Sequence, residues 1–93
     1  MAIKVTIRRK TDHRHADKIQ ALLCAFECWA SKQTGYFYGE NLEDTQRPGE
    51  YLFVSTWRSL EAFHQWHQSP TSRKLEQQMA STCGIETDSI VCA

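Results

Sequence analysis

The stretch EYLFVSTWRSLEAFHQWHQSP, residues 50–70, decides the fold. Its first eight residues, EYLFVSTW, predict a β-strand, and the residues that follow predict a helix. Ser59 suits the N-cap of that helix because its hydroxyl can accept a backbone N–H, and Glu61 suits the positive first turn. Proline disfavours helical geometry in the residue before it, so the helix is expected to break at Ser69-Pro70.

The flanking sequence supplies the other elements. IKVTIRR, residues 3–9, alternates apolar and polar side chains and predicts a strand. Residues 15–33 predict an amphipathic helix that ends at Gly35, with Thr11 or Asp12 as its N-cap. Its apolar stripe consists of Ile19, Leu22, Leu23, Phe26 and Ala30, flanked by Trp29. Further predictions are a strand at YFYGENLE (36–43), a hairpin turn at DTQRPG (44–49), a helical segment at TSRKLEQQM (71–79) and a closing strand at SIVCA (89–93).

This order of elements defines the fold class. It is β-α-β-β-α-β, the α+β, ferredoxin-like arrangement, in which an antiparallel sheet carries its helices on one face. Residues 1–93 are expected to form one domain. In residues 50–57, Tyr51, Phe53 and Trp57 point to one side, whereas Leu52 and Val54 point to the other. Because both faces of this strand are apolar, we expect a second copy to cover the helix-free face in a homodimer.

Composition narrows the range of partners. Eleven basic and eleven acidic residues balance, so no global field attracts nucleic acid or an anionic membrane. The N-terminal residues lack the apolar region of a signal peptide, and we expect a cytoplasmic protein without a membrane segment. Four cysteines are present without a CxxC motif or the spacing of a zinc site, and reduced thiols are therefore expected.

Two segments together resemble a known family. TGYFYGENL, followed by EYLFVSTWRSLEAFHQWHQSP, is similar to the antibiotic biosynthesis monooxygenase domain, a dimeric α+β barrel group. The similarity rests on Thr34-Gly35-Tyr36 at the start of a strand, on Trp57 at the end of another, and on Ser59, Glu61 and Ala62 at the start of the helix. Trp66 before Ser69-Pro70 completes it, and the resemblance extends from Ile3 to about Met79.

The resemblance is more specific for fold than for chemistry, because the family includes quinone-forming oxygenases, haem degraders and sugar-phosphate-processing enzymes. Haem degraders pair a tryptophan at position 66 with an axial histidine ten residues later and use an asparagine in the first strand. This chain has Glu76 at the later position and no asparagine in IKVTIRR, which disfavours haem degradation.

The cofactor-independent oxygenases of the family are the other model. They deprotonate a polycyclic phenol and let the carbanion react with oxygen. Their best-known sequence pattern has an Asn four residues before the strand-end Trp and a Tyr six residues after it. In this chain Trp57 matches, but the other two positions hold Phe53 and Phe63. The resemblance implies a monooxygenase that needs no cofactor and acts on a hydrophobic, aromatic or quinone-like molecule. The alternative is a non-catalytic ligand-binding or dimerisation module.

Candidate site residues come from the same segments. Leu60, Phe63, Trp66 and His67 share one face of the predicted helix, with His64 at its border. Such an aromatic face packs into the core or lines a cavity for a flat substrate. For the cavity we expect Trp57, Phe63, Trp66, Phe53 and Tyr36 as substrate-binding residues, and His67 as the base that removes a phenol proton. His64 and His67 have no third ligand nearby in sequence, and His13 and His15 are expected to be solvated, so no metal site is predicted.

Overall fold

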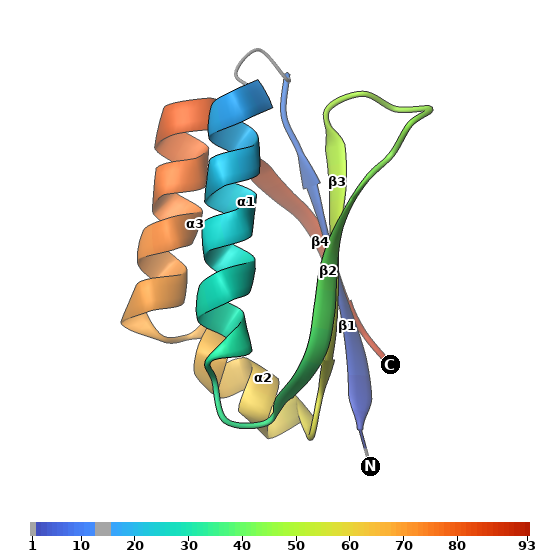
Figure 1. The fold of residues 1–93 in the computed structure, drawn as a ribbon, viewed down its shortest axis with the longest axis vertical. Coiled ribbons are helices and arrows are strands. Elements are labelled where there is room, and N and C mark those ends of the chain that lie inside the picture. The colour runs from blue at the N-terminus through green and yellow to red at the C-terminus, as the bar shows by residue number, and fades with distance from the viewer. Residues whose placement is uncertain (1, 13–15) are drawn as a thin grey trace.

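The computed structural model describes residues 2–12 and 16–93. The elements in chain order are β1 (Ile3–Lys10), α1 (Ala16–Ser31), β2 (Tyr36–Glu43), β3 (Glu50–Trp57), α2 (Leu60–His67), α3 (Pro70–Cys83) and β4 (Glu86–Cys92). The four strands form one antiparallel sheet in the order β2-β3-β1-β4. All three helices lie on one face of this sheet (Figure 1). The predicted ferredoxin-like class is confirmed.

Strand β3 has the two faces that the sequence predicts. It pairs with β1 over its whole length, from Glu50 opposite Lys10 to Trp57 opposite Ile3. Its buried residues alternate with partly buried ones, so that Phe53 and Trp57 face the helices while Val54 faces away from them. The helix-free face of the sheet therefore carries apolar side chains without cover from the helices.

Local capping explains how the chain turns from sheet to helices. The hydroxyl of Ser59 accepts the backbone N–H of Ala62 at 3.1 Å and starts α2, as predicted. The hydroxyl of Ser69 accepts the N–H of Ser72 at 3.2 Å and starts α3, with Pro70 as its first residue. The predicted break at Ser69-Pro70 is confirmed.

Other boundaries differ from the predictions or lie outside the described residues. Strand β4 begins three residues earlier than predicted, shortly after Gly84 ends α3 in a left-handed conformation. The N-terminal boundary of α1 and the environment of His13 and His15 fall outside the described residues. Thr11, one of the two predicted caps, donates its hydroxyl to the carbonyl of Cys83 at 2.8 Å, and the choice between Thr11 and Asp12 as N-cap stays a prediction.

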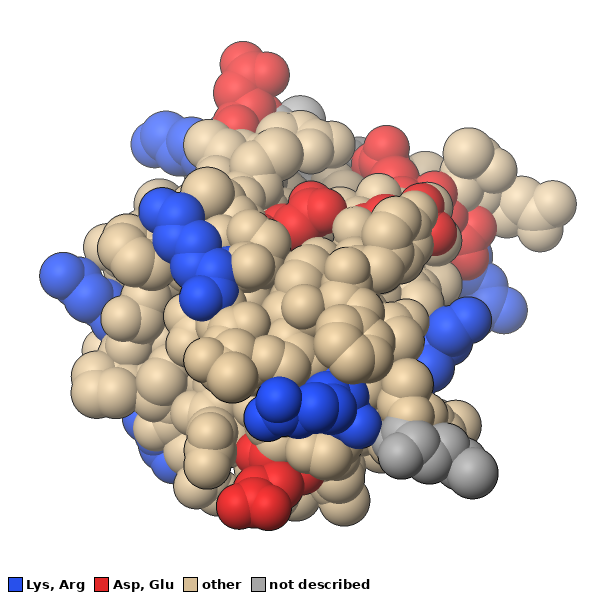
Figure 2. Space-filling view, turned by 60° about the horizontal axis from the view of Figure 1, so that its bottom comes forward, with Lys and Arg blue, Asp and Glu red and all other residues tan. Residues whose placement is uncertain are grey.

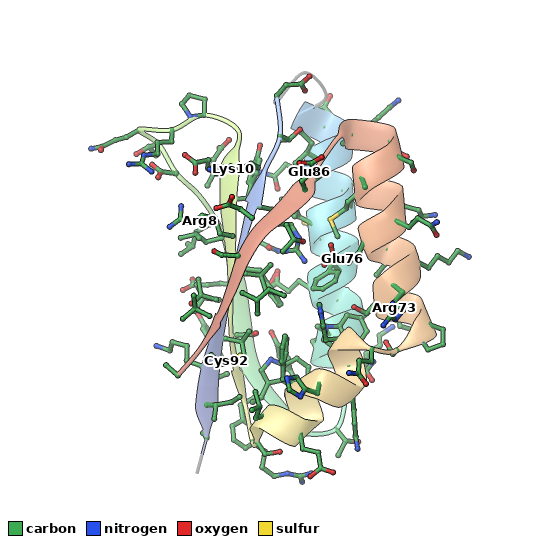
Figure 3. The ribbon with its side chains drawn as sticks, turned by 180° about the vertical axis from the view of Figure 1, so that it is seen from behind. Arg8, Lys10, Arg73, Glu76, Glu86 and Cys92 are labelled. Atoms are coloured by element: carbon green, nitrogen blue, oxygen red, sulfur yellow. The ribbon has the colours of Figure 1, made fainter. Side chains whose placement is uncertain are left out.

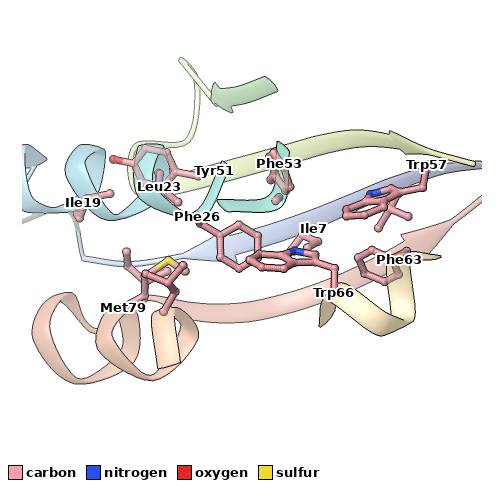
Figure 4. Close-up of a cluster of buried hydrophobic side chains, with 14 of the residues drawn as sticks. Ile7, Ile19, Leu23, Phe26, Tyr51, Phe53, Trp57, Phe63, Trp66 and Met79 are labelled. Carbon is pink, nitrogen blue, oxygen red and sulfur yellow. The ribbon is translucent and has the colours of Figure 1, made fainter. Parts of the chain in front are cut away.

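Aromatic side chains fill the core between sheet and helices (Figure 4). Phe26 of α1 contacts Trp66 edge-to-face at 5.3 Å between ring centroids and Phe53 at 5.6 Å. Leu60, which was expected on the same helix face as Phe63 and Trp66, is 43% exposed and lies outside this core. At about 100° per residue, Leu60 lies roughly 120° around the helix from the buried Trp66, so the face that meets the sheet is narrower than the sequence suggests.

Candidate functional site

A pocket of about 360 Å³ opens between the helices and the edge strand β4. It is lined by His67, Arg73, Glu76, Thr87 and Ile90. These residues come from the end of α2, the first two turns of α3 and strand β4 (Figure 3). The volume lies at the lower end of the range for small-molecule sites.

The fold accounts for this grouping. Arg73 and Glu76 are three residues apart on α3 and therefore share one face of that helix. Ile90 pairs with the buried Ile7 across the β1–β4 ladder, which places its side chain on the helix side of the sheet. Thr87 pairs with Arg9, next to an irregularity in the same ladder.

Behind the pocket, Arg9 is a buried cation. It continues the inward face of β1 after Ile7 and is 1% exposed. Its Nη2 donates to Oε1 of Glu76 at 2.6 Å, and its guanidinium lies 4.5 Å from the ring centroid of Phe26. The other carboxylate oxygen of Glu76 accepts the hydroxyl of Thr87 at 3.2 Å. Both oxygens of Glu76 are therefore engaged, which limits its capacity to act as the base of the pocket.

His67 is the titratable group of the pocket with the most perturbed environment. Its ring stacks on Phe63 at 5.4 Å with a 19° angle between the planes, and its Nδ1 is buried without a hydrogen-bond partner among the described residues. Burial lowers the pKa of His67 below its ordinary value; Glu76 acts in the opposite direction, and Arg73, His64 and Arg9 lower it further. At neutral pH the imidazole is thus uncharged and can accept a proton.

The predicted aromatic site residues lie in the core and not in the pocket lining. Trp57, Phe53, Phe63 and Trp66 are all buried, and the indole N–H of Trp57 donates to the Ser55 hydroxyl at 2.9 Å. Tyr36 is partly buried, with its ring 5.3 Å from that of Trp57. Trp57 and Trp66 are thus absent from the lining of this pocket, because their rings fill the space between sheet and helices. Their expected role as the wall of a ligand cavity stays a prediction.

These aromatic residues are nevertheless linked to the pocket. Edge-to-face contacts connect Tyr36 to Trp57 and Trp57 to Phe63, and the ring of Phe63 stacks on that of His67. Burial raises the pKa of Tyr36, and Glu27 and Tyr38 raise it further, so this phenol keeps its proton at neutral pH. Of the six predicted site residues, only His67 lies on the pocket wall.

Arg9 and Arg73 were not among the site residues that the sequence predicted. A signal for Arg9 existed, because Ile3, Val5 and Ile7 form an inward face whose next position is 9. The resemblance to the family marks Glu76 only as a carboxylate at the position where haem degraders have a histidine. The spacing of Arg73 and Glu76 is compatible with one helix face, but sequence alone does not tell which face lies against β4.

The remaining features concern the rest of the described chain, residues 2–12 and 16–93. Within these ranges no group of three His, Cys, Asp or Glu side chains has an arrangement that could hold a metal ion. None of the helices described there has the length and apolar character needed to cross a membrane. On the face shown in Figure 2, Lys and Arg side chains are dispersed among uncharged residues.

Comparisons with known proteins agree with this architecture. The model of the antibiotic biosynthesis monooxygenase family matches residues 2–78, whereas a search of curated proteins found no match. Among solved structures, SnoaB, a cofactor-independent oxygenase from Streptomyces nogalater, superposes with a TM-score of 0.85 at 11% identity, covering 99% of this chain and 90% of SnoaB.

Two further structures are similar. A conserved protein from Methanosarcina mazei gives a TM-score of 0.86 at 14% identity over 100% of this chain and 91% of its own. A Deinococcus radiodurans protein, provisionally named as an antibiotic biosynthesis monooxygenase, gives 0.84 at 19% identity over 100% of this chain and 90% of its own. At these identities the structures establish a shared fold, and the family model covers most of the chain. The chain belongs to the antibiotic biosynthesis monooxygenase family.

Proposed function

We propose that this protein is a single-domain, cofactor-independent monooxygenase of the cytoplasm, which oxidises a hydroxylated aromatic molecule such as a quinol. The observation that carries the proposal is the placement of His67, an imidazole kept neutral by burial, on the wall of a small-molecule-sized pocket. A neutral imidazole next to a bound phenol is a suitable general base. Family membership supports the same reaction type.

The reaction begins with transfer of a phenolic proton to His67. The resulting anion is electron-rich and reacts with dioxygen: one oxygen atom enters the ring, the other leaves as water, and the substrate supplies all four electrons. A quinol and O₂ thus give a hydroxyquinone and water, without a bound redox group. Glu76, which favours the charged form of His67, stabilises the imidazolium after proton transfer.

The aromatic residues are assigned supporting roles in this proposal. Phe63 holds the His67 ring by stacking, and Ile90 supplies an apolar wall for a flat ring system. Trp57, Phe53, Trp66 and Tyr36 form the aromatic layer behind Phe63, and contact between them and a substrate stays a prediction. A larger cavity that includes them would require the core to repack around the ligand.

A homodimer is part of the proposal. On the helix-free face, Leu42 lies opposite Leu52, and Thr6 lies between Val54 and Val91. Val91 is 57% exposed and Leu42 43%, although both are large apolar side chains. A second copy of the same face is the simplest cover for this surface.

The alternative is a non-catalytic binding module. It is favoured by the observation that the aromatic residues expected around a substrate are used in the core. The two functions differ in whether His67 takes part in chemistry.

Oxygen uptake tests the proposal. Wild-type protein is mixed with an anaerobically prepared naphthoquinol, and oxygen consumption is followed together with incorporation of ¹⁸O from ¹⁸O₂. We expect catalysed uptake with one labelled atom in the product, its loss in His67→Ala, and its retention in the control His64→Ala, which changes an exposed histidine on the same helix. Equal rates in wild type and His67→Ala would favour the binding module.

A further inference from the structure

We propose that Arg73 makes this pocket selective for aromatic acids: the ring of the substrate lies against Ile90 and the His67 side, and its carboxylate lies against Arg73. This inference names the substrate class of the proposed oxygenase site and therefore rests on the proposed function. It starts from the charges that surround the pocket.

Arg73 is the cation of the pocket wall that is available to bind an anionic ligand group. It forms no ion pair with any residue in the described ranges 2–12 and 16–93, and its side chain is exposed at the pocket. The nearest acidic residue on the same face of α3 is Glu76, whose two oxygens are held by Arg9 and Thr87. Glu76 is therefore committed to the buried guanidinium and does not neutralise Arg73.

The acidic residues of β4, Glu86 and Asp88, do not neutralise Arg73. Asp88 pairs with Lys10 at 3.6 Å, and Glu86 lies opposite Lys10 in the β1–β4 register. Figure 3 shows Glu86 near Lys10, away from Arg73. With His67 uncharged, two guanidinium groups and one carboxylate leave one positive charge unbalanced around the pocket. An anionic ligand group is the complement of that charge.

The chemistry of arginine favours a planar anion. A guanidinium presents paired N–H donors that match the two oxygens of a carboxylate. Because Arg73 is reachable from solvent, the attraction is partly screened, and we expect a preference of about tenfold, equivalent to about 1.4 kcal/mol. Added salt should reduce this preference.

Binding of a matched pair of probes tests the inference. 6-Hydroxy-2-naphthoate and 6-hydroxy-2-naphthamide share ring system, hydroxyl group and size, and differ in the charge of one substituent. Their dissociation constants are measured by equilibrium dialysis with wild type, Arg73→Gln, Arg73→Lys and the control Lys74→Gln, which removes an exposed charge from the next residue. Thermal melting followed by circular dichroism verifies that each variant is folded.

We expect wild type and Lys74→Gln to bind the acid about tenfold more tightly than the amide, Arg73→Lys to keep part of the preference, and Arg73→Gln to lose it. Equal binding of the two probes by wild type, an undiminished preference in Arg73→Gln, or no binding of either probe would overturn the inference. The assay involves no turnover. If the protein prefers the acid but shows no oxygen uptake, the oxygenase is rejected and the acid site is kept. If oxygen uptake occurs at equal rates with acidic and amidated quinols, the oxygenase is kept and the acid site is rejected.

Discussion

The guanidinium of Arg9 and the carboxylate of Glu76 are joined at 2.6 Å, and the pair connects a fully buried position of β1 to the wall of the pocket. Its two ends differ in exposure: the Arg9 side chain is 1% exposed and that of Glu76 27%. Removing the carboxylate leaves a buried, unpaired cation, whereas removing the guanidinium leaves a carboxylate that water can reach.

This asymmetry predicts how mutations affect stability. We expect Glu76→Ala to lower the free energy of unfolding by about 3–5 kcal/mol, the usual result of breaking a buried ion pair. Adding Arg9→Met to Glu76→Ala should recover part of that loss, because methionine can pack against Phe26 without a charge. Denaturant unfolding of the two single variants and the double variant measures this.

A matched control is available on the other face of β1. Arg8 is partly exposed and lies 3.6 Å from Glu50, so Arg8→Met should change the free energy of unfolding by no more than about 1 kcal/mol. If the double variant were less stable than Glu76→Ala alone, Arg9 would not be an uncompensated charge in the single variant.

The same pair shows what the sequence could reveal. Strand β3, helix α2 and the break at Pro70 were predictable because alternation, a serine cap and proline act locally. The set of titratable groups that meet in the pocket was not predictable from the sequence. Their meeting depends on strand β4 lying beside β1 and opposite α3. The burial of Trp57 and Trp66 was unpredictable for a similar reason. The sequence indicates which face of an element points inward, but not whether side chains fill the space behind that face.

Proton transfer to His67 should give the reaction a characteristic pH profile. Because the pKa of His67 is lowered, the apparent second-order rate constant kcat/KM should rise with increasing pH, with its midpoint below about pH 6.5. At neutral pH it should no longer change. Arg73→Gln removes a cation that lowers this pKa, so the rise should move to higher pH. Kinetics from pH 5 to 8 and an NMR titration of the His67 ring should agree; a profile without this rise would exclude His67 as the base.

Stability should respond to the same proton. A histidine with a lowered pKa in the folded state is neutral in both states above about pH 6.5, and its effect on stability is then absent. As pH falls below that value, the unfolded state takes up the proton first and stability falls until the folded-state pKa is passed. His67→Gln should show a smaller loss of stability than wild type over that interval, measured by denaturant unfolding at each pH.

Haem binding is expected to be absent. Members of the family that degrade haem use a histidine at the position of Glu76, and this carboxylate is engaged by Arg9 and Thr87. Titration with haem should therefore give no specific Soret shift at low micromolar concentration. A shift that disappeared in His64→Ala or His67→Ala would identify another axial ligand and contradict this prediction.

The helix-free face of the sheet is expected to be buried in a homodimer. Val54 lies on β3, one of the two central strands, and its register partners are Thr6 and Glu40. If two copies bury this face, a lysine at position 54 must lose its hydration in the dimer, although it can remain solvated in the monomer. We expect sedimentation equilibrium to show wild type as a dimer at micromolar concentration and Val54→Lys as a monomer, with at least a hundredfold weaker association. Gln20→Lys adds the same charge on the exposed side of α1 and should stay dimeric. A wild-type monomer at micromolar concentration would show that this face remains open, and would reject the dimer while leaving the His67 pocket, which is formed within one chain, unaffected.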